Sequence, residues 1–463
     1  MNSMKLKHKC GIFGLYSIEH SNTTITNTII GLKHLQHRGR ESAGISYINI
    51  DGEIIVYKKF GLVKDVFLEE NYIKPCFSCI GHVRYSTTKK KIYIDKKKEY
   101  SLIQPLWNQC HLGEFSIVHN GNIPNVERLA KKWNIVLKTD SDSELFVQLI
   151  KTNRFTTWEE KFIHIVDTVP GIYSLIIQTK NCIYGIKDRF GTRPLCFGKN
   201  ANTFCLSSES SYLAECSYVR ELECGEILKI TKSGEKTMYI KDNTSPQFCV
   251  FELIYFMKHT SIRYNETVET YRYLFGQKLG ETEDIIPYGS ETIFVTDIPN
   301  TAIPSAKGYA SALNIKYLPI FEKKKGTGRT FILPDNTQRY TTNRIGLQIR
   351  NNLTIDKYQS IILVDDSLVR GNTIRNIILK LKEFGFTTIH LRISSPPIRH
   401  PCYYGIDIPT KEELIAHQKT PDEIANILNI TSLRYLDYPS MASLFHNNIC
   451  GSCFTGKYNK ELV

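Results

Sequence analysis

The hydrophobic pattern changes its period part of the way along this chain, and this change is the strongest constraint on the fold. From about residue 10 to 240, short alternating segments predict strands. Two of them, ISYINI and EIIVYKKF, flank Asp51-Gly52, a pair typical of a type I′ hairpin turn. Helical periodicity in this half is found at 26–35, 142–150 and 158–169. Strands with a few helices predict a layered α+β domain.

Beyond about residue 285 the pattern becomes strand, turn and helix. TIFVT precedes PSAKGYASAL, and IILVDD precedes TIRNIILKLKEFG, which TIHLRIS follows. This alternation predicts an α/β domain with a parallel sheet. The polar stretch 241–250 is the predicted junction. Because 463 residues exceed what one core usually supports, we expect two domains, 10–245 and 246–463.

Composition excludes some classes of function. No apolar run reaches the length of about 18 residues that a membrane span needs, and the basic N-terminus lacks the apolar core of a secretory signal. We therefore expect a cytoplasmic chain without a membrane partner. The net charge of +13 could indicate nucleic acid, but much of the excess lies in lysine runs at 89–98 and 323–325, without interleaved aromatics. We expect no nucleic-acid partner.

Cys10 lies in the glycine-bracketed segment CGIFG, which predicts a strand. A chain cut before it would begin with cysteine, which offers a thiol nucleophile and an α-amine that can act as a general base near neutral pH. A buried core cysteine is the alternative for this residue taken alone.

Five further motifs accompany Cys10: LQHRGRESAG, GHVRYSTT, HNGNI, TDSDSE and DRFGTRPL. Together and in this order they resemble the glutaminase domain of class II glutamine amidotransferases. The resemblance implies the αββα layered fold of N-terminal nucleophile hydrolases. It also implies that residues 1–9 form a propeptide whose removal exposes Cys10.

The resemblance implies a role for each motif residue. Asn120 and the backbone N–H of Gly121 would form the oxyanion hole. Arg84 would bind the α-carboxylate of glutamine, Asp142 its α-ammonium group, and Arg38 would close over the substrate. Taken singly, Asn120-Gly121 can be a turn, Asp142 a helix cap and Arg84 a surface ion pair.

An acid pair, Asp365-Asp366, follows four apolar residues and precedes a polar turn and an amphipathic helix. This order predicts a site at the carboxyl end of a buried strand. The helix N-terminus would suit a phosphate, and the carboxylates would suit ribose hydroxyls or a divalent cation. A helix cap beside a strand is the simpler alternative.

The stretch IILVDDSLVRGNT resembles the phosphoribosyl diphosphate signature of type I phosphoribosyltransferases, and nearly the full chain resembles amidophosphoribosyltransferases. That family transfers ammonia from glutamine to phosphoribosyl diphosphate in purine synthesis. The resemblance implies Mg²⁺ at Thr301, Asp365 and Asp366. It also implies substrate contacts from Arg329, Asp365, Asp366, Ser367, Arg370, Gly371, Asn372 and Thr373.

Four of the thirteen cysteines match the ligands of a [4Fe–4S] cluster in one branch of this family. They are Cys249, Cys402, Cys450 and Cys453. Only the last two form a close C-x₂-C pair, which could equally be a zinc or redox motif. The resemblance further implies purine nucleotides as feedback inhibitors and a homotetramer.

Several positions depart from the family pattern. Leu102 replaces an Asn of the glutamine loop, Thr301 lies in an altered pyrophosphate loop, and Asn372 replaces a Thr. Further departures from the family pattern are found at Lys89, 323–326 and Gly346.

Because of these departures, two other functional hypotheses stay open. One is a non-catalytic regulator that binds phosphoribosyl diphosphate or nucleotides. The other is a glutaminase with a different acceptor, as in glucosamine-phosphate synthases or asparagine synthetases, which the acid pair disfavours.

Overall fold

A computed structural model describes residues 10–68, 74–85, 101–139, 141–242, 244, 246–323, 347–350, 360–408 and 410–462. These residues form two compact units. The first holds the described residues up to Phe248 together with Tyr403–Asp407 and 458–462. The second comprises Cys249–Cys402 and Ile408–Lys457. The first unit thus takes in two short segments from late in the sequence.

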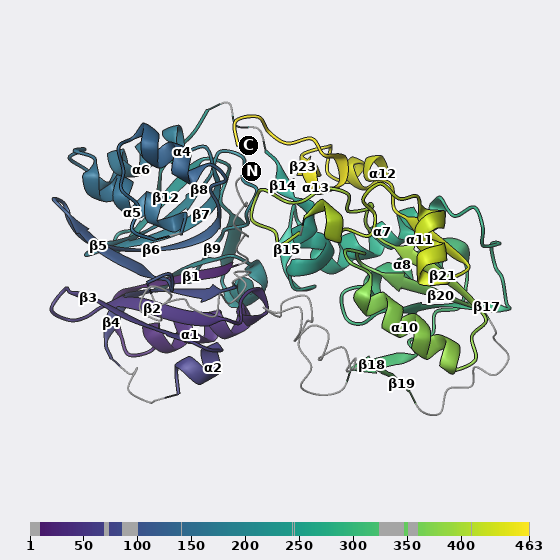
Figure 1. The fold of residues 1–463 in the computed structure, drawn as a ribbon. Coiled ribbons are helices and arrows are strands. Elements are labelled where there is room, and N and C mark those ends of the chain that lie inside the picture. The colour runs from purple at the N-terminus through teal and green to yellow at the C-terminus, as the bar shows by residue number, and fades with distance from the viewer. Residues whose placement is uncertain are drawn as a thin grey trace. The chain divides into compact units, whose positions relative to one another are not determined.

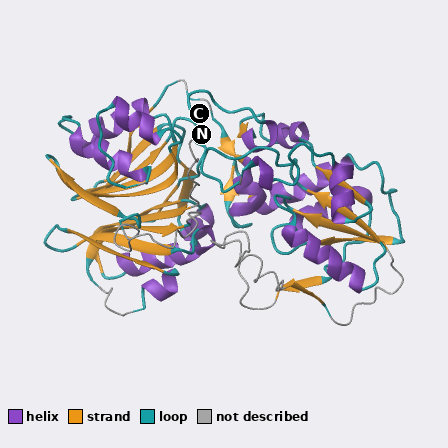
Figure 2. Cartoon of the chain, in the orientation of Figure 1, coloured by secondary structure: helices purple, strands orange, loops and turns teal. Residues whose placement is uncertain are grey.

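The first unit contains two antiparallel sheets (Figures 1 and 2). The seven-stranded sheet has the order β11-β9-β10-β1-β4-β2-β3, with β1 (Cys10–Ser21) between β10 and β4. The six-stranded sheet has the order β13-β12-β8-β7-β6-β5. The remaining bounds are β2 (Ser42–Ile48), β3 (Ile54–Phe60), β4 (Cys76–Arg84), β5 (Leu106–Cys110), β6 (Gly113–Asn122), β7 (Ile172–Thr179), β8 (Cys182–Lys187), β9 (Cys196–Lys199), β10 (Thr203–Ser207), β11 (Tyr218–Glu221), β12 (Glu226–Thr231) and β13 (Gly234–Ile240).

Three hydrophobic clusters join the layers of this unit. Ile12 and Ile80 of one sheet pack with Ile176 of the other, so the sheets stack face to face. Helices cover both outer faces (Figure 1). They are α1 (Thr24–His34) and α2 (Val63–Val66) on one side, and α4 (Val126–Lys132), α5 (Ser143–Thr152) and α6 (Trp158–Thr168) on the other, with η1 (Gln36–Arg38) and η3 (Ser210–Glu215) as short 3₁₀ turns. The predicted layered α+β architecture is confirmed.

The predicted hairpin around Asp51-Gly52 is present, because β2 pairs with β3. The predicted type I′ turn is wrong. That turn needs positive φ at two successive residues, whereas here only Gly52 has positive φ, at 82°. The loop spans residues 49–53, and the side chain of Asn49 accepts hydrogen bonds from the backbone of Asp51 and Glu53. This side chain organises a longer loop in place of the two-residue turn.

The second unit is built around a four-stranded parallel sheet of order β17-β20-β21-β22, as the strand-helix alternation predicts. Its strands are β17 (Ile293–Asp297), β20 (Ser360–Asp365), β21 (Thr388–Ile393) and β22 (Ser432–Tyr435). Three two-stranded pairs add β14 (Phe248–Cys249) with β23 (Ile449–Cys450), β15 (Ile262–Arg263) with β16 (Glu266–Thr267), and β18 (Phe321–Lys323) with β19 (Leu347–Ile349). The helices are η4 (Glu252–Phe256), α7 (Val268–Glu281), α8 (Ile303–Leu313), α10 (Asn372–Glu383), η6 (Lys411–Glu413), α11 (Pro421–Leu428), α12 (Tyr438–Ser443) and α13 (Ser452–Thr455).

The apolar face of α10, formed by Ile374, Ile377, Ile378 and Leu381, is buried against the parallel sheet. The strands of a parallel sheet end on the same edge, so the loops after β17 and β20 lie beside each other there. None of the described helices is both long and apolar enough to cross a membrane.

Candidate active sites

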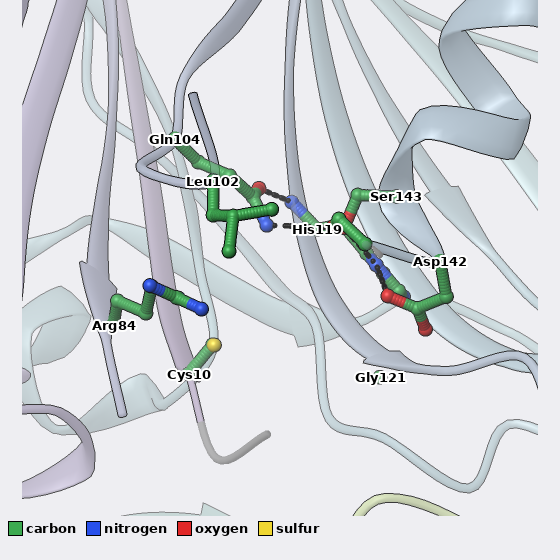
Figure 3. Close-up of a pocket in the computed structure, with 9 residues that line it drawn as sticks. Cys10, Arg84, Leu102, Gln104, His119, Gly121, Asp142 and Ser143 are labelled. Atoms are coloured by element: carbon green, nitrogen blue, oxygen red, sulfur yellow. Dashed lines mark hydrogen bonds and ion pairs between the residues drawn. The ribbon is translucent and has the colours of Figure 1, made fainter. Parts of the chain in front are cut away.

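A pocket with about 250 Å³ of open space lies in the first unit (Figure 3). Nine residues line it: Cys10, Arg84, Leu102, Gln104, His119, Gly121, Ser141, Asp142 and Ser143. They come from the start of β1, the end of β4, the segment before β5, the end of β6 and the start of α5. Cys10, Arg84, Gly121 and Asp142, which lie far apart in the sequence, thus meet at one small cavity.

Cys10 is the first residue of β1 and pairs with Arg84 across the ladder to β4. Its side chain is buried, and burial raises the pKa of the thiol to about 12. The backbone N–H of Tyr85 donates to the sulfur, and this hydrogen bond together with the charge of Arg84 acts in the opposite direction. Because the net shift is upward, the thiol needs a strong local base to become a nucleophile.

Two opposite charges lie in the pocket wall. Arg84 is almost fully buried, and its Nη1 lies 3.5 Å from Oε1 of Glu41. Asp142 precedes α5 in the N-cap position, but its side chain does not cap the helix. Instead, Oδ2 of Asp142 accepts a hydrogen bond from the N–H of Ile123 at 2.9 Å. An arginine and a carboxylate on one pocket suit the two ends of an amino acid.

Asn120 and Gly121 lie at the end of β6. Asn120 is fully buried, and among the described residues neither atom of its side-chain amide has a hydrogen-bond partner. Orphaned buried polar groups are costly and mark functional sites. A Cβ at Gly121 would lie 2.0 Å from the carbonyl oxygen of Ile172, so any residue other than glycine would clash with the backbone here. The two residues offer one amide N–H₂ and one backbone N–H, the donors that an oxyanion requires.

Three buried polar residues of the pocket were given no role by the sequence. Oγ of Ser143 bonds both Nδ1 of His119, at 2.9 Å, and Nε2 of Gln104, at 3.1 Å. Oε1 of Gln104 accepts from the backbone N–H of His119 at 2.6 Å. Burial, and next the charge of Arg193, lower the pKa of His119 to about 3, so this ring is neutral at physiological pH. His119 opens the HNGNI motif and Ser143 lies in TDSDSE, so these two motifs are the sequence signals for this network.

Arg38 is buried beside Cys10 but is not among the residues that line the pocket. Its Nε donates to the carbonyl oxygen of Cys10 at 3.0 Å, and its Nη1 donates to Glu209 at 2.8 Å. The structure thus shows the side chain of Arg38 bound to the main chain of Cys10.

In the second unit, the acid pair follows a buried strand as predicted, since Asp365 ends β20 and Asp366 begins the next loop. The N–H of Asp366 donates to Asp365 Oδ1 at 2.9 Å, and Oγ of Ser367 donates to Asp366 Oδ1 at 2.6 Å. Thr301 lies in the loop after the neighbouring parallel strand β17. Hydroxyl and carboxylate oxygens at adjacent strand ends form a donor set that suits Mg²⁺.

The turn after the acid pair leads into α10 through Gly371, whose φ of 79° suits glycine. Asn372 and Thr373 open that helix. The side chain of Arg370 donates from Nε to Oε2 of Glu413 at 2.8 Å, so it is paired with a surface carboxylate. Outside the described residues lie Arg329, the propeptide 1–9, Lys89, 324–326 and Gly346.

The four cysteines that the family resemblance implies as cluster ligands all belong to the second unit. Cys249 ends β14, which pairs with β23, where Cys450 lies. The carbonyl of Cys453 accepts from the N–H groups of Arg399 and His400, just before Cys402. The pKa of Cys453 is raised well above its usual value, first by burial and then by these three thiols.

Among the described residues, no three His, Cys, Asp or Glu side chains surround a single ion. A cluster with one thiolate on each iron holds its sulfurs farther apart than one ion does. Cys249, Cys402 and Cys450 all lie within electrostatic range of Cys453, which is compatible with the wider spacing of cluster ligands.

Comparisons with known proteins agree with this arrangement. A glutamine amidotransferase domain model matches residues 90–215. The amidophosphoribosyltransferase of Rattus norvegicus is 36% identical over 99% of this chain and 92% of its own length. That of Bacillus subtilis is 33% identical over 99% of this chain and 95% of its own length.

Two solved structures match the fold. Glutamine phosphoribosylpyrophosphate amidotransferase from B. subtilis, complexed with ADP and GMP, has a TM-score of 0.82 and 31% identity over 98% of this chain and 99% of that chain. A structure of the allosteric regulatory enzyme of purine biosynthesis gives 0.83 and 31% over 98% of both chains. Because relatives of 33–36% identity match nearly the full length of the chain, the chain belongs to the amidophosphoribosyltransferase family.

Proposed function

We propose that this chain hydrolyses glutamine at Cys10 and transfers the ammonia to C1 of 5-phosphoribosyl diphosphate, giving 5-phosphoribosylamine, pyrophosphate and glutamate. This is the first step of de novo purine synthesis. The observation that carries the proposal is that Cys10, Arg84, Gly121 and Asp142 together line one pocket of the first unit. Membership of the amidophosphoribosyltransferase family over nearly the full chain supports phosphoribosyl diphosphate as the acceptor of the ammonia.

Glutamine lies with its α-carboxylate on Arg84 and its α-ammonium group on Asp142, which aims the carboxamide at Cys10. The thiolate attacks the amide carbon, and Asn120 with the N–H of Gly121 stabilises the oxyanion. As this intermediate collapses, the C–N bond breaks and the leaving nitrogen takes up the proton that the base removed from the thiol, so neutral ammonia is released. Water then hydrolyses the thioester to glutamate and restores the thiol.

The base is the α-amine of Cys10, available once residues 1–9 are removed. The upward shift of the pKa of the Cys10 thiol supports this assignment, because a buried thiol with a pKa of about 12 is scarcely ionised at neutral pH. An α-amine with a pKa near 8 on the same residue can take the thiol proton directly.

In the second unit, ammonia displaces pyrophosphate from C1 of the ribose. Thr301, Asp365 and Asp366 would hold Mg²⁺, which would supply positive charge to the leaving pyrophosphate. Asp365 and Asp366 also face the ribose hydroxyls, and the N-terminus of α10 receives the 5-phosphate. The substrate contacts are Arg329, Ser367, Arg370, Gly371, Asn372 and Thr373, and contact by Arg370 requires release of its pair with Glu413.

The remaining assignments follow the family. Cys249, Cys402, Cys450 and Cys453 hold a [4Fe–4S] cluster with a structural role. Purine nucleotides inhibit the enzyme, in keeping with the ADP and GMP bound to the B. subtilis relative. The chain forms a cytoplasmic homotetramer.

The proposal is tested by measuring glutamate and pyrophosphate release from purified protein supplied with glutamine, phosphoribosyl diphosphate and Mg²⁺. We expect the two products in equal amounts, and pyrophosphate alone when ammonium chloride replaces glutamine. Release of glutamate without pyrophosphate would refute the proposal that phosphoribosyl diphosphate accepts the ammonia. Nucleotide or phosphoribosyl diphosphate binding without either product would instead favour the non-catalytic regulator.

The maturation step has its own test. N-terminal sequencing of active protein should begin at Cys10. A variant with alanine at position 10 should lose glutamine-dependent activity and keep the ammonium-dependent reaction, because only the glutaminase needs the nucleophile. Full glutaminase activity in protein that retains Met1 would contradict the free-amine mechanism.

A further inference from the structure

Glu209 is a fully buried carboxylate in the first unit with no role in the sequence motifs or in the pocket wall. It follows β10 and precedes η3. Its Oε1 accepts from Nη1 of Arg38 at 2.8 Å and lies 2.7 Å from Nε2 of His37. Burying a carboxylate is unfavourable unless charged donors satisfy it, so this pairing favours one defined geometry.

Arg38 connects this carboxylate to the nucleophile. Its Nε donates to the carbonyl oxygen of Cys10 at 3.0 Å, and its side chain is only 3% exposed. A guanidinium is a planar donor array, so fixing Nη1 on Glu209 also fixes the direction in which Nε points. The position of the Cys10 carbonyl therefore depends on Glu209 through one rigid group.

The ladder of β1 explains why Cys10 needs this contact. On one side, β1 pairs with β4 from Cys10 onward. On the other side, the pairing with β10 starts only at Phe13, opposite Ser207. The first three residues of β1 therefore have no ladder partner on that side.

Ser208 and Glu209 take the place of the missing ladder. Ser208 donates its N–H to the carbonyl of Ile12 and accepts the N–H of Ile12 on its Oγ, both at 3.0 Å. Glu209, through Arg38, holds the carbonyl of Cys10. Contacts from Ser208 and Glu209 thus hold the first residues of β1 on the side where the ladder to β10 has not yet begun.

We propose that Glu209 is a positioning residue of the glutaminase reaction, which through Arg38 fixes the main chain of Cys10 and so the direction of its thiol. This inference rests on the proposed glutaminase function. It also assigns Arg38 to the nucleophile, in place of the substrate contact that the sequence motif implies. Misplacement of a reacting group by about 1 Å can cost about a hundredfold in rate.

The test compares Glu209→Gln with Glu226→Gln in the full chain. Glu226 is a matched control, because it is also a buried carboxylate of the first unit paired with one arginine, Arg220, away from the pocket. For E209Q we expect the glutamine-dependent kcat to fall about 10- to 100-fold, with KM for glutamine within about twofold of its original value. Ammonium-dependent pyrophosphate release should change less than about twofold in both variants, and E226Q should keep its kcat.

A double-mutant cycle with Arg38→Gln tests whether Glu209 acts through Arg38. In the Arg38→Gln background, E209Q should lower kcat by less than about threefold, because the two residues act as one unit. Independent, additive losses would overturn the proposal. So would an unchanged kcat in E209Q, a rise of KM alone, or equal loss of the ammonium-dependent reaction. Failure of the proposed function is distinct, since the unsubstituted protein would then release no glutamate.

Discussion

At the scale of single residues, the side-chain amide of Asn120 is buried with no hydrogen-bond partner among the described residues. An unpaired amide costs about 1–3 kcal/mol of folding free energy per orphaned group, so its retention needs a functional reason. The donor of an oxyanion hole is such a reason, because its partner forms only during the reaction.

We expect Asn120→Ala to lower the glutamine-dependent kcat about 10²- to 10³-fold, which corresponds to about 3–4 kcal/mol of lost transition-state stabilisation. The midpoint of thermal unfolding should not fall, because the substitution removes an unsatisfied group. Steady-state kinetics and calorimetry measure the two quantities. An N120A variant with lower stability and unchanged kcat would show that the amide is a structural group.

Residue identity is predictable from sequence where a motif carries the chemistry. Cys10, Arg84, Gly121 and Asp142 were predicted from their motifs, and the structure brings them to one pocket. Gln104 and Glu209 were not predicted, because their roles depend on distant partners. Gln104 bonds the backbone of His119, and Glu209 bonds Arg38, which lies 171 positions earlier. No local pattern encodes such an approach.

At the scale of elements, α7 and α8 cross at glycines in the second unit. A Cβ at Gly308 would lie 2.0 Å from the carbonyl oxygen of Tyr273, and one at Gly276 would lie 1.8 Å from that of Ser305. Both clashes are with backbone atoms, so a side chain at either site can be accommodated only if one helix moves.

We expect Gly308→Ala to destabilise the protein, although alanine favours helix by about 1 kcal/mol. The steric cost of overpacking is about 1–3 kcal/mol or more, and against backbone the upper end applies. Ser311→Ala on the exposed face of α8 is the control, which should leave stability unchanged or slightly raised. Denaturant unfolding measures both. Equal stability of the two variants would show that the helices separate freely here.

Element type was predictable because periodicity is a local property, and element ends were less so. The predicted helix at 26–35 is observed at Thr24–His34. The turn at Gly52 differs from its prediction because the side chain of Asn49, outside the Asp-Gly pair, organises the loop. Strand order could not be predicted, since β1 pairs with β10, nearly 200 positions later.

At the scale of the whole molecule, two of the proposed cluster ligands lie where the chain passes between the two units. Cys249 is the first residue of the second unit, and Cys402 is the last before the segment Tyr403–Asp407 of the first. A group that ties these positions together fixes where the chain leaves and rejoins the second unit. Its loss should therefore loosen more of the molecule than the four residues that hold it.

At the proposed cluster site, binding of iron would be coupled to ionisation of the thiols. Burial and the neighbouring thiols raise the pKa of Cys453, so four thiolates together would be strongly unfavourable without iron. Under the proposed cluster assignment, iron would bind only the native state and would add its binding free energy to stability. With that coupling, Cys402→Ser should lose the cluster iron and lower the unfolding midpoint by about 5–10 °C.

Cys110→Ser is the matched control, because Cys110 ends β5 in the first unit and is only partly buried. It should keep its iron and its unfolding midpoint when both variants are purified without oxygen. Iron content, visible absorbance and calorimetry distinguish the outcomes. Unsubstituted protein that is fully stable and free of iron would reject the cluster. A [4Fe–4S] cluster usually has four thiolate ligands. A C402S variant that keeps its iron would therefore show that Cys402 is not one of them.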